Sequence, residues 1–465
     1  MANLVPAEQL AASAEIRESN SRRSEPEDSS HSPTDSAGPW SLTAVAAPLL
    51  LVALWVVKLY TTWGAWGNLT IDSGHEMYVP AMLAQGKVLY RDLWFPFGPA
   101  APYFTSYLYR LFGVNLNVLY WAGALSALGT AIFLYLTGRR LSSQVIGWTA
   151  GAVVLLEAFQ PSIFCFPLPY SSAAVYGCFV GALFLWLIAQ ACYSESRVWV
   201  LAAGTASAIA LLLKPEFGIA CYGTLACLIA VRWLFQRSPS QLAGDVAATL
   251  PGIAICGLVI RWMVSIAGAE FITQENVQSW PTSYFLKTYG KTWLAHTGFT
   301  VSGSDFLAAA RRSVPVAGVL LAAAVLLRWK RFDTRSILAR ILILFSLALY
   351  FIQQNYFVLP LKQDMTLILT KFFFPQDMVL YILMAAAGAW CYFCWRPAQA
   401  LILAFPLLFT FSGLLAFRVL MKMNSIGYPV LYNGPVVLSF LLLLGLLIPR
   451  SGRSHRFIFL AELGL

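Results

Sequence analysis

The stretch from Val436 to Ile448 reads VVLSFLLLLGLLI and contains no charged residue. The runs from Leu401 to Phe417 (LILAFPLLFTFSGLLAF) and from Val314 to Leu327 have the same character. With the apolar residues that flank them, such runs approach the roughly 20 residues that a helix needs to cross a bilayer. Lipid offers no partners to backbone amides, and the strict alternation of barrel strands is absent. The sequence therefore predicts membrane-spanning helices.

The composition of the whole chain supports the same fold class. Of its 465 residues, 59% are hydrophobic and only 11% are charged, and the mean hydropathy is +0.68. Soluble domains carry roughly 25% charged residues, so a water-soluble core cannot hide this much apolar surface. We expect an all-α polytopic membrane protein with about twelve transmembrane helices. The expected spans are 41–61, 114–137, 145–164, 171–191, 198–213, 217–235, 246–266, 314–327, 337–357, 378–395, 398–417 and 434–448.

The two ends of the chain differ from the apolar part, residues 39–450. Residues 1–38 are rich in Ser, Glu, Asp, Arg and Pro, which predicts a disordered cytoplasmic tail. Residues 451–465 form a short second tail. Because the first apolar run starts near Ser41, we expect no cleavable signal peptide.

The basic residues predict the orientation. With the N-terminus inside, arginines such as Arg139, Arg197 and Arg328 fall in the inner loops, as the positive-inside rule requires. We therefore expect a multi-pass protein of the plasma (inner) membrane with both termini cytoplasmic. This topology accounts for the net charge of +10 without a nucleic-acid partner.

The acidic residues beyond the first tail lie mainly on the opposite, extracytoplasmic side. The first loop there, residues 62–113, is the largest and contains Asp72, Glu76 and Asp92. Because carboxylates at a membrane interface are costly unless they are solvated or used, this asymmetry indicates that the working face is external.

The stretch from Ile71 to Tyr103 in this loop reads IDSGHEMYVPAMLAQGKVLYRDLWFPFGPAAPY. It predicts an amphipathic helix that begins near Asp72, continues through Ala84 and ends in a turn at Gly86. Such a helix is expected to lie in the membrane interface.

These residues resemble a known family. An acid just after the first span, a tyrosine, the pattern LxxGKVLYRD and then Phe97-Gly98-Pro99 are similar to the GT-C superfamily of polyprenyl-phosphate-sugar-dependent glycosyltransferases. The likeness is greatest to the branch of dolichyl-phosphate-mannose mannosyltransferase-like and ArnT-like proteins (glycosyltransferase family 39 or RgtA-like). The segment LLLKPEFGIA, from Leu211 to Ala220, also resembles the Lys-Pro turn of those proteins.

The resemblance implies an inverting transfer of a sugar from a polyprenyl-phosphate donor to a lipid or glycan acceptor on the extracytoplasmic side. Asp72 matches the family's general base. Arg91 and Lys214 are the first choices for the cation that binds the donor phosphate. Much of the family instead has a lysine before the proline that leads into the second span, where this chain has Phe97-Gly98-Pro99, so the phosphate partner stays open. The further substrate-binding candidates are Asp92, Glu76, His75 and Tyr78.

Each of these residues has a simpler interpretation. Asp72 is also suited to cap the helix that it begins. Asp92 is also placed to pair with Arg91, His75 to form an interfacial hydrogen bond, and Lys214 to pair with Glu216 across Pro215. Carboxylates and one histidine have suitable atoms for a divalent metal, but the pattern is weak and we expect no metal or other cofactor.

Two other functions are compatible with the sequence. One is a transporter or flippase for a lipid-linked or polar solute, although transporters usually place ionisable groups near the midplane of the membrane. The other is a non-catalytic subunit of an envelope-polysaccharide assembly, which would not need Asp72.

Overall fold

Helices make up most of the chain that the computed structural model describes. The described residues are 42–67, 72–160, 165–194, 196–236, 238–273, 407–415, 434–435, 437–439 and 441–442. The chain divides into two units, residues 1–46 and residues 47–465, and the boundary falls inside the first described helix. Among the described residues there is no β-strand, and Leu89 and Leu93 form an isolated bridge.

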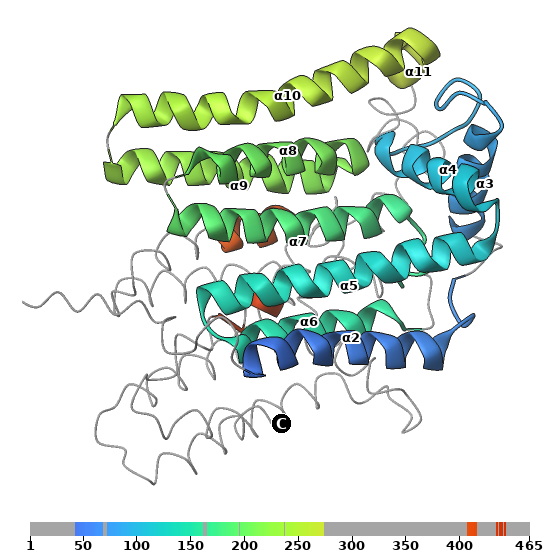
Figure 1. Ribbon diagram of the computed structural model, residues 1–465. Coiled ribbons are helices and arrows are strands. Elements are labelled where there is room, and N and C mark those ends of the chain that lie inside the picture. Colours follow the sequence, from blue (N-terminus) through green and yellow to red (C-terminus); the bar gives the residue numbers. More distant parts are fainter. Residues whose placement is uncertain are drawn as a thin grey trace, which may run out of the picture. The chain divides into compact units, whose positions relative to one another are not determined.

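Seven long helices follow the apolar runs of the sequence. They are α2 (Leu42–Thr62), α5 (Leu116–Leu141), α6 (Gln144–Ala158), α7 (Ser172–Tyr193), α8 (Arg197–Leu213), α9 (Pro215–Gln236) and α10 (Pro239–Ala267). In the second unit α5 packs against α6 and α7, and α8 packs against α7, α9 and α10. These helices run roughly side by side (Figure 1).

The seven expected spans from 41–61 to 246–266 each correspond to one of these helices. By length and composition, α5, α7, α10 and residues 215–233 of α9 are able to cross a membrane, and residues 46–62, α6 and α8 are shorter apolar helices. The expected spans 314–327, 337–357 and 378–395 lie outside the described residues, and 398–417 and 434–448 are described only in part. The total of about twelve spans stays a prediction.

Two helix bounds differ from expectation. We expected a span over 145–164, but α6 already ends at Ala158, three residues before Pro161, because the residue before a proline is disfavoured in the helical conformation. Helix α10 begins seven residues earlier than the expected 246 and contains Pro251 in its interior.

Capping residues and glycines explain where the helices begin and how closely they approach. The side chain of Ser171 accepts a hydrogen bond from the backbone N–H of Ala174 at the start of α7, as serine does at N-caps generally. On α10, a Cβ added at Gly252 would lie 2.3 Å from the carbonyl oxygen of Gly204 on α8. Small residues of this kind let apolar helices pack backbone to backbone.

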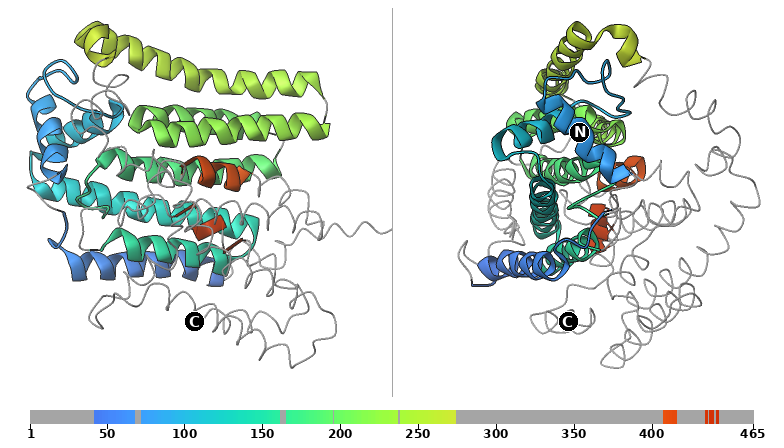
Figure 2. Two further views of the ribbon diagram at one scale, coloured as in Figure 1. Left: turned by 180° about the vertical axis from the view of Figure 1, so that it is seen from behind. Right: turned by 90° about the vertical axis from the view of Figure 1, so that its right-hand side faces the viewer.

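Two short helices lie across one end of the long ones. They are α3 (Asp72–Ala84) and α4 (Ala100–Phe112), which pack against each other. The connections α5–α6, α7–α8 and α9–α10 lie at the opposite end, and the four-residue helix α11 (Ala269–Ile272) follows α10 near α3 and α4 (Figures 1 and 2). Arg139 and Arg140 lie in the last turn of α5 and Arg197 begins α8, so these three arginines lie at the far end. The orientation of the two ends in a membrane stays a prediction.

Candidate functional site

Helix α3 begins at Asp72 and ends at Ala84, the bounds that the sequence predicted. The chain then turns at Gly86, whose φ of +94° is readily adopted by glycine. Next to Asp72, the buried Ser73 donates from its Oγ to the backbone oxygens of Leu168 at 3.4 Å and Pro169 at 3.2 Å.

Glu76 lies one turn further along α3 and has only 4% of its surface exposed. Its Oε2 accepts a hydrogen bond from the backbone N–H of Ser172 at 3.0 Å and another from the Ser172 hydroxyl. Burial raises the pKa of the Glu76 carboxyl above its ordinary value, while the two Ser172 hydrogen bonds and the charges of His75 and Lys214 act in the opposite direction.

Lys214 follows the last residue of α8 and is fully buried. Its Nζ lies 3.5 Å from Oε1 of Glu216 and donates to the hydroxyl of Tyr170 at 3.3 Å. The ammonium also lies 4.6 Å from the centre of the Phe97 ring, a cation–π contact. The expected Lys214–Glu216 pair across Pro215 is confirmed.

The Phe97-Gly98-Pro99 segment, where the sequence departs from the family, packs directly on this lysine. A Cβ at Gly98 would lie 2.0 Å from the carbonyl oxygen of Leu212, so only glycine allows this approach. The close contact holds the neighbouring Phe97 ring over Lys214. Glu76, Lys214 and Glu216 thus form a buried charge cluster. It is surrounded by residues from α3, the segment 97–98, the segment 170–172 and the α8–α9 turn.

Arg91 and Asp92 form a separate pair. Nε of Arg91 lies 3.0 Å from Oδ1 of Asp92, and Nη1 of Arg91 donates to the carbonyl oxygen of Ile266 near the end of α10 at 3.3 Å. The hydrogen bond from Arg91, together with one from the backbone N–H of Val88, lowers the pKa of Asp92 to about 2. The Arg91 side chain is 46% exposed, so it stays accessible to an anion.

The remaining candidates, His75 and Tyr78, lie in the first half of α3. Nε2 of His75 is 3.1 Å from the carbonyl oxygen of Trp94, and its ring stacks on Phe95. Tyr78 is 56% exposed. The part of the chain that the structure describes contains no group of three or more His, Cys, Asp or Glu residues that is arranged to hold a metal ion.

The structure therefore brings Glu76 and Lys214 together and places Arg91 with Asp92 elsewhere. The roles predicted for these residues, for His75 and Tyr78, and for Asp72 as the base stay predictions. The sequence did not point to Ser172 or Tyr170. The serine pair at 171–172 before an apolar run signals a helix start, but nothing in it reveals a contact with Glu76.

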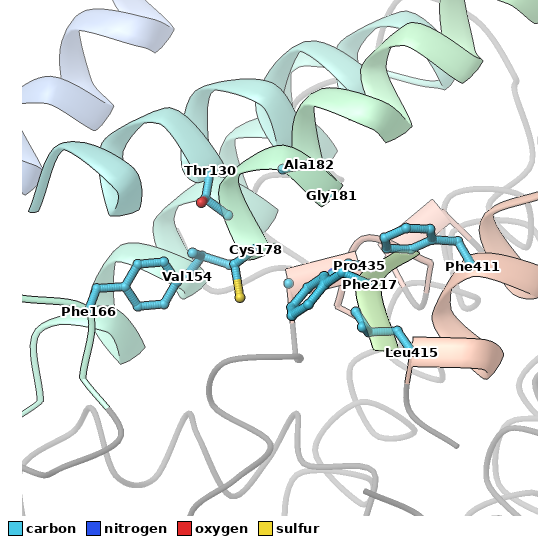
Figure 3. Close-up of a pocket in the computed structure, with 11 residues that line it drawn as sticks. Thr130, Val154, Phe166, Cys178, Gly181, Ala182, Phe217, Phe411, Leu415 and Pro435 are labelled. Atoms are coloured by element: carbon cyan, nitrogen blue, oxygen red, sulfur yellow. The ribbon is translucent and has the colours of Figure 1, made fainter. Parts of the chain in front are cut away.

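A narrow apolar pocket with a cavity volume of about 10 Å³ lies deeper between the helices (Figure 3). Phe217, which lines it, directly follows Glu216 of the charge cluster. Thr130 of α5, Val154 of α6, Cys178 of α7 and Phe411 also contribute to its wall.

Comparisons with known proteins give one match in sequence and several likenesses in structure. Residues 96–252 match the family described as dolichyl-phosphate-mannose-protein mannosyltransferase. The matched segment contains Gly98, Ser172 and Lys214 but begins after Asp72 and Glu76. No curated protein matches the chain in sequence at a significant level.

The solved structures with similar chains include ArnT from Cupriavidus metallidurans and the oligosaccharyltransferase AglB from Archaeoglobus fulgidus. ArnT in the apo state has 14% identity and a TM-score of 0.36 over 83% of this chain and 78% of that one. ArnT bound to undecaprenyl phosphate has 15% identity and a TM-score of 0.35 over 91% and 78%. AglB in complex with an inhibitory peptide and a dolichol-phosphate has 14% identity and a TM-score of 0.34 over 90% and 57%. Because these TM-scores are low, we assign neither fold nor function from them.

Proposed function

We propose that the chain is a glycosyltransferase of the GT-C superfamily that transfers a sugar from a polyprenyl-phosphate donor, on the ground that residues 96–252 match the mannosyltransferase family. The acceptor is a lipid or glycan hydroxyl on the extracytoplasmic side of the membrane. We assign the reaction to the end of the helices where α3 and α4 lie.

The buried ion pair of Lys214 and Glu216 is the observation that carries this proposal. Ionisable groups buried within membrane proteins are costly and usually mark substrate or ion sites. Here the ammonium of Lys214 and the carboxylate of Glu216 are buried together, at the end of the helices where α3 begins with Asp72. The matched family segment includes both residues of this ion pair.

In the proposed reaction, the acceptor hydroxyl oxygen attacks the anomeric carbon of the donor sugar as the bond from that carbon to the phosphate oxygen breaks. The carboxylate of Asp72 takes the hydroxyl proton, and the polyprenyl phosphate leaves with the electron pair. Attack opposite the leaving group inverts the anomeric configuration. A phosphate is a weakly basic leaving group, so a cation contributes more than an acid.

Lys214 and Arg91 are the cations that we assign to the donor phosphate. Lys214 lies in the charge cluster, and Glu216 holds its ammonium in place at 3.5 Å. Arg91 is more exposed and its guanidinium is fixed by Asp92. An arginine fork binds phosphate in a bidentate manner, whereas lysine acts as a point charge.

The substitution Asp72→Asn tests the catalytic assignment. Asparagine cannot take the proton, so we expect transfer to fall by roughly 10²–10⁴-fold, the usual contribution of a general base. Asparagine caps helices about as well as aspartate, so an Asp72 that only caps α3 would leave transfer unchanged. The measurement is kcat for sugar transfer in nanodiscs, normalised to folded protein.

The matched control is Glu270→Gln, which neutralises an exposed acid in α11 near the same end of the helices. This variant should keep wild-type kcat. Full activity in a well-folded Asp72→Asn protein would remove Asp72 from the reaction and favour the transporter or the assembly subunit instead.

A further inference from the structure

Helix α3 contacts residues 168–172, at and just before the start of α7, at two points, and the paired residues are 95 or 96 positions apart in the sequence. Ser73 donates to the backbone oxygens of Leu168 and Pro169, and Glu76 accepts from Ser172. Both side chains are buried. Asp72 adjoins Ser73, so these contacts bracket the first turn of α3.

The Glu76–Ser172 contact provides an acceptor for the Ser172 N–H and donors for the buried Glu76 carboxyl group. Ser172 is the first residue of α7, and the first backbone N–H groups of a helix have no acceptor within the helix. The Ser171 hydroxyl oxygen accepts a hydrogen bond from the backbone N–H of Ala174. Oε2 of Glu76 accepts one from the backbone N–H of Ser172. A carboxylate at this position also meets the positive end of the helix dipole.

The geometry points to a positioning role for Glu76: its carboxyl group, bound to the first residue of α7, fixes the first turn of α3 and thereby the place of Asp72. This inference rests on the proposed function, because the importance of that place comes from the reaction. Oε2 of Glu76 accepts both of its hydrogen bonds from Ser172, so this carboxylate connects α3 directly to the start of α7.

The loss of activity expected without the Glu76–Ser172 contact follows from how accurately a catalytic group must be placed. Displacing a catalytic group by about 1 Å costs on the order of 10²-fold in rate, even when the substitution is remote from the chemistry. Ser73 would still hold one side of the turn, so we expect a loss of about 10–100-fold in kcat, with little change in KM for the donor.

The experiment compares Glu76→Ala with Glu76→Gln and Ser172→Ala in nanodiscs. Glutamine keeps an acceptor oxygen for the Ser172 N–H, so Glu76→Gln should retain kcat within a few-fold of wild type, while Glu76→Ala should lose about 10–100-fold. Ser172→Ala keeps the backbone N–H contact and should have an intermediate effect. An equal loss in Glu76→Gln and Glu76→Ala would overturn the inference, because the carboxylate itself would then be needed. Wild-type kcat in folded Glu76→Ala would overturn it too.

Thr105→Val is the matched control. It removes a buried hydrogen bond of 3.1 Å between Thr105 of α4 and the Tyr176 hydroxyl of α7 at the same end of the helices, but it leaves the contacts of α3 intact. This variant should keep wild-type kcat. A loss of kcat in Thr105→Val as large as that in Glu76→Ala would show that kcat is sensitive to any altered contact at this end of the helices. It would contradict a specific role for the Glu76–Ser172 contact.

Hydrogen exchange separates this inference from the proposed function, because it needs no activity. Glu76→Ala should speed amide exchange over residues 73–84 and leave α8 as in wild type, whether or not sugar transfer is detected. Absence of transfer by the wild-type protein with faster exchange in α3 would refute the function and keep the anchor. Unchanged exchange in α3 would refute the anchor.

Discussion

Lys214 has no exposed surface, yet a carboxylate, a hydroxyl and an aromatic ring surround its ammonium group. Removing one partner of a buried ion pair leaves the other charge uncompensated, which costs more than the pair itself contributes. A single substitution of Lys214 therefore mixes two effects, a loss of stability and a loss of donor binding. The two effects are separable by neutralising Glu216 as well.

We expect Lys214→Ala to lower the free energy of unfolding by about 3–5 kcal/mol, because Glu216 then stays buried without its cation. The double variant Lys214→Ala/Glu216→Gln should recover much of that stability. Its kcat/KM for the donor should still be reduced. The reduction should correspond to about 1.5–3 kcal/mol, the typical contribution of a charge-assisted hydrogen bond. Thermal unfolding measures the stability of the single and double variants, and donor kinetics on the same samples measure kcat/KM. Wild-type kcat/KM in the stable double variant would exclude Lys214 as a phosphate ligand.

At the scale of the helices, the end opposite α3 is held by an arginine. The guanidinium of Arg232 on α9 contacts both carboxylate oxygens of Asp245 on α10, at 3.3 and 3.2 Å. It also donates to the carbonyl oxygens of Ala191 and Ser194 at the end of α7. Carbonyls at a helix C-terminus have no partner within the helix. One side chain thus connects three helices.

Arg232→Ala should lower the free energy of unfolding by about 3–5 kcal/mol, because Asp245 stays buried without its cation. Arg232→Lys should restore only part of this, since lysine lacks the fork that reaches several oxygens at once. Arg139→Ala removes an exposed arginine from the same end and should change stability little. Thermal unfolding in one detergent provides the comparison. Similar losses for Arg139→Ala and Arg232→Ala would contradict the connecting role.

The helices were also the part that the sequence predicted best. Long apolar runs predicted most of the described helix starts to within a few residues, and α10 begins seven residues earlier than expected. Contacts within a few residues were predicted too, such as Lys214 with Glu216 and Arg91 with Asp92, because only a short piece of chain separates the partners.

At the scale of the whole molecule, prediction from sequence was weaker. The substrate-binding role expected for Glu76 stays a prediction, and its bond to Ser172, which the sequence did not predict, depends on how helices far apart in the sequence pack. The packing of Phe97 over Lys214 depends in the same way on Gly98 lying against α8. Hydropathy and periodicity describe each helix alone and carry no information about such pairs. The sidedness of the two ends rests on the arginine distribution and stays a prediction.

The central claim concerns the molecule as a whole, namely that it is an inverting glycosyltransferase that uses a polyprenyl-phosphate donor. The most direct measurement incubates the wild-type protein in nanodiscs with a panel of polyprenyl-phosphate sugars and candidate lipid and glycan acceptors. We expect one donor to release polyprenyl phosphate in equal amount to the glycosylated product, with the product's anomeric configuration opposite to that of the donor. A retained configuration, or no release of polyprenyl phosphate from any donor by the folded protein, would contradict the account.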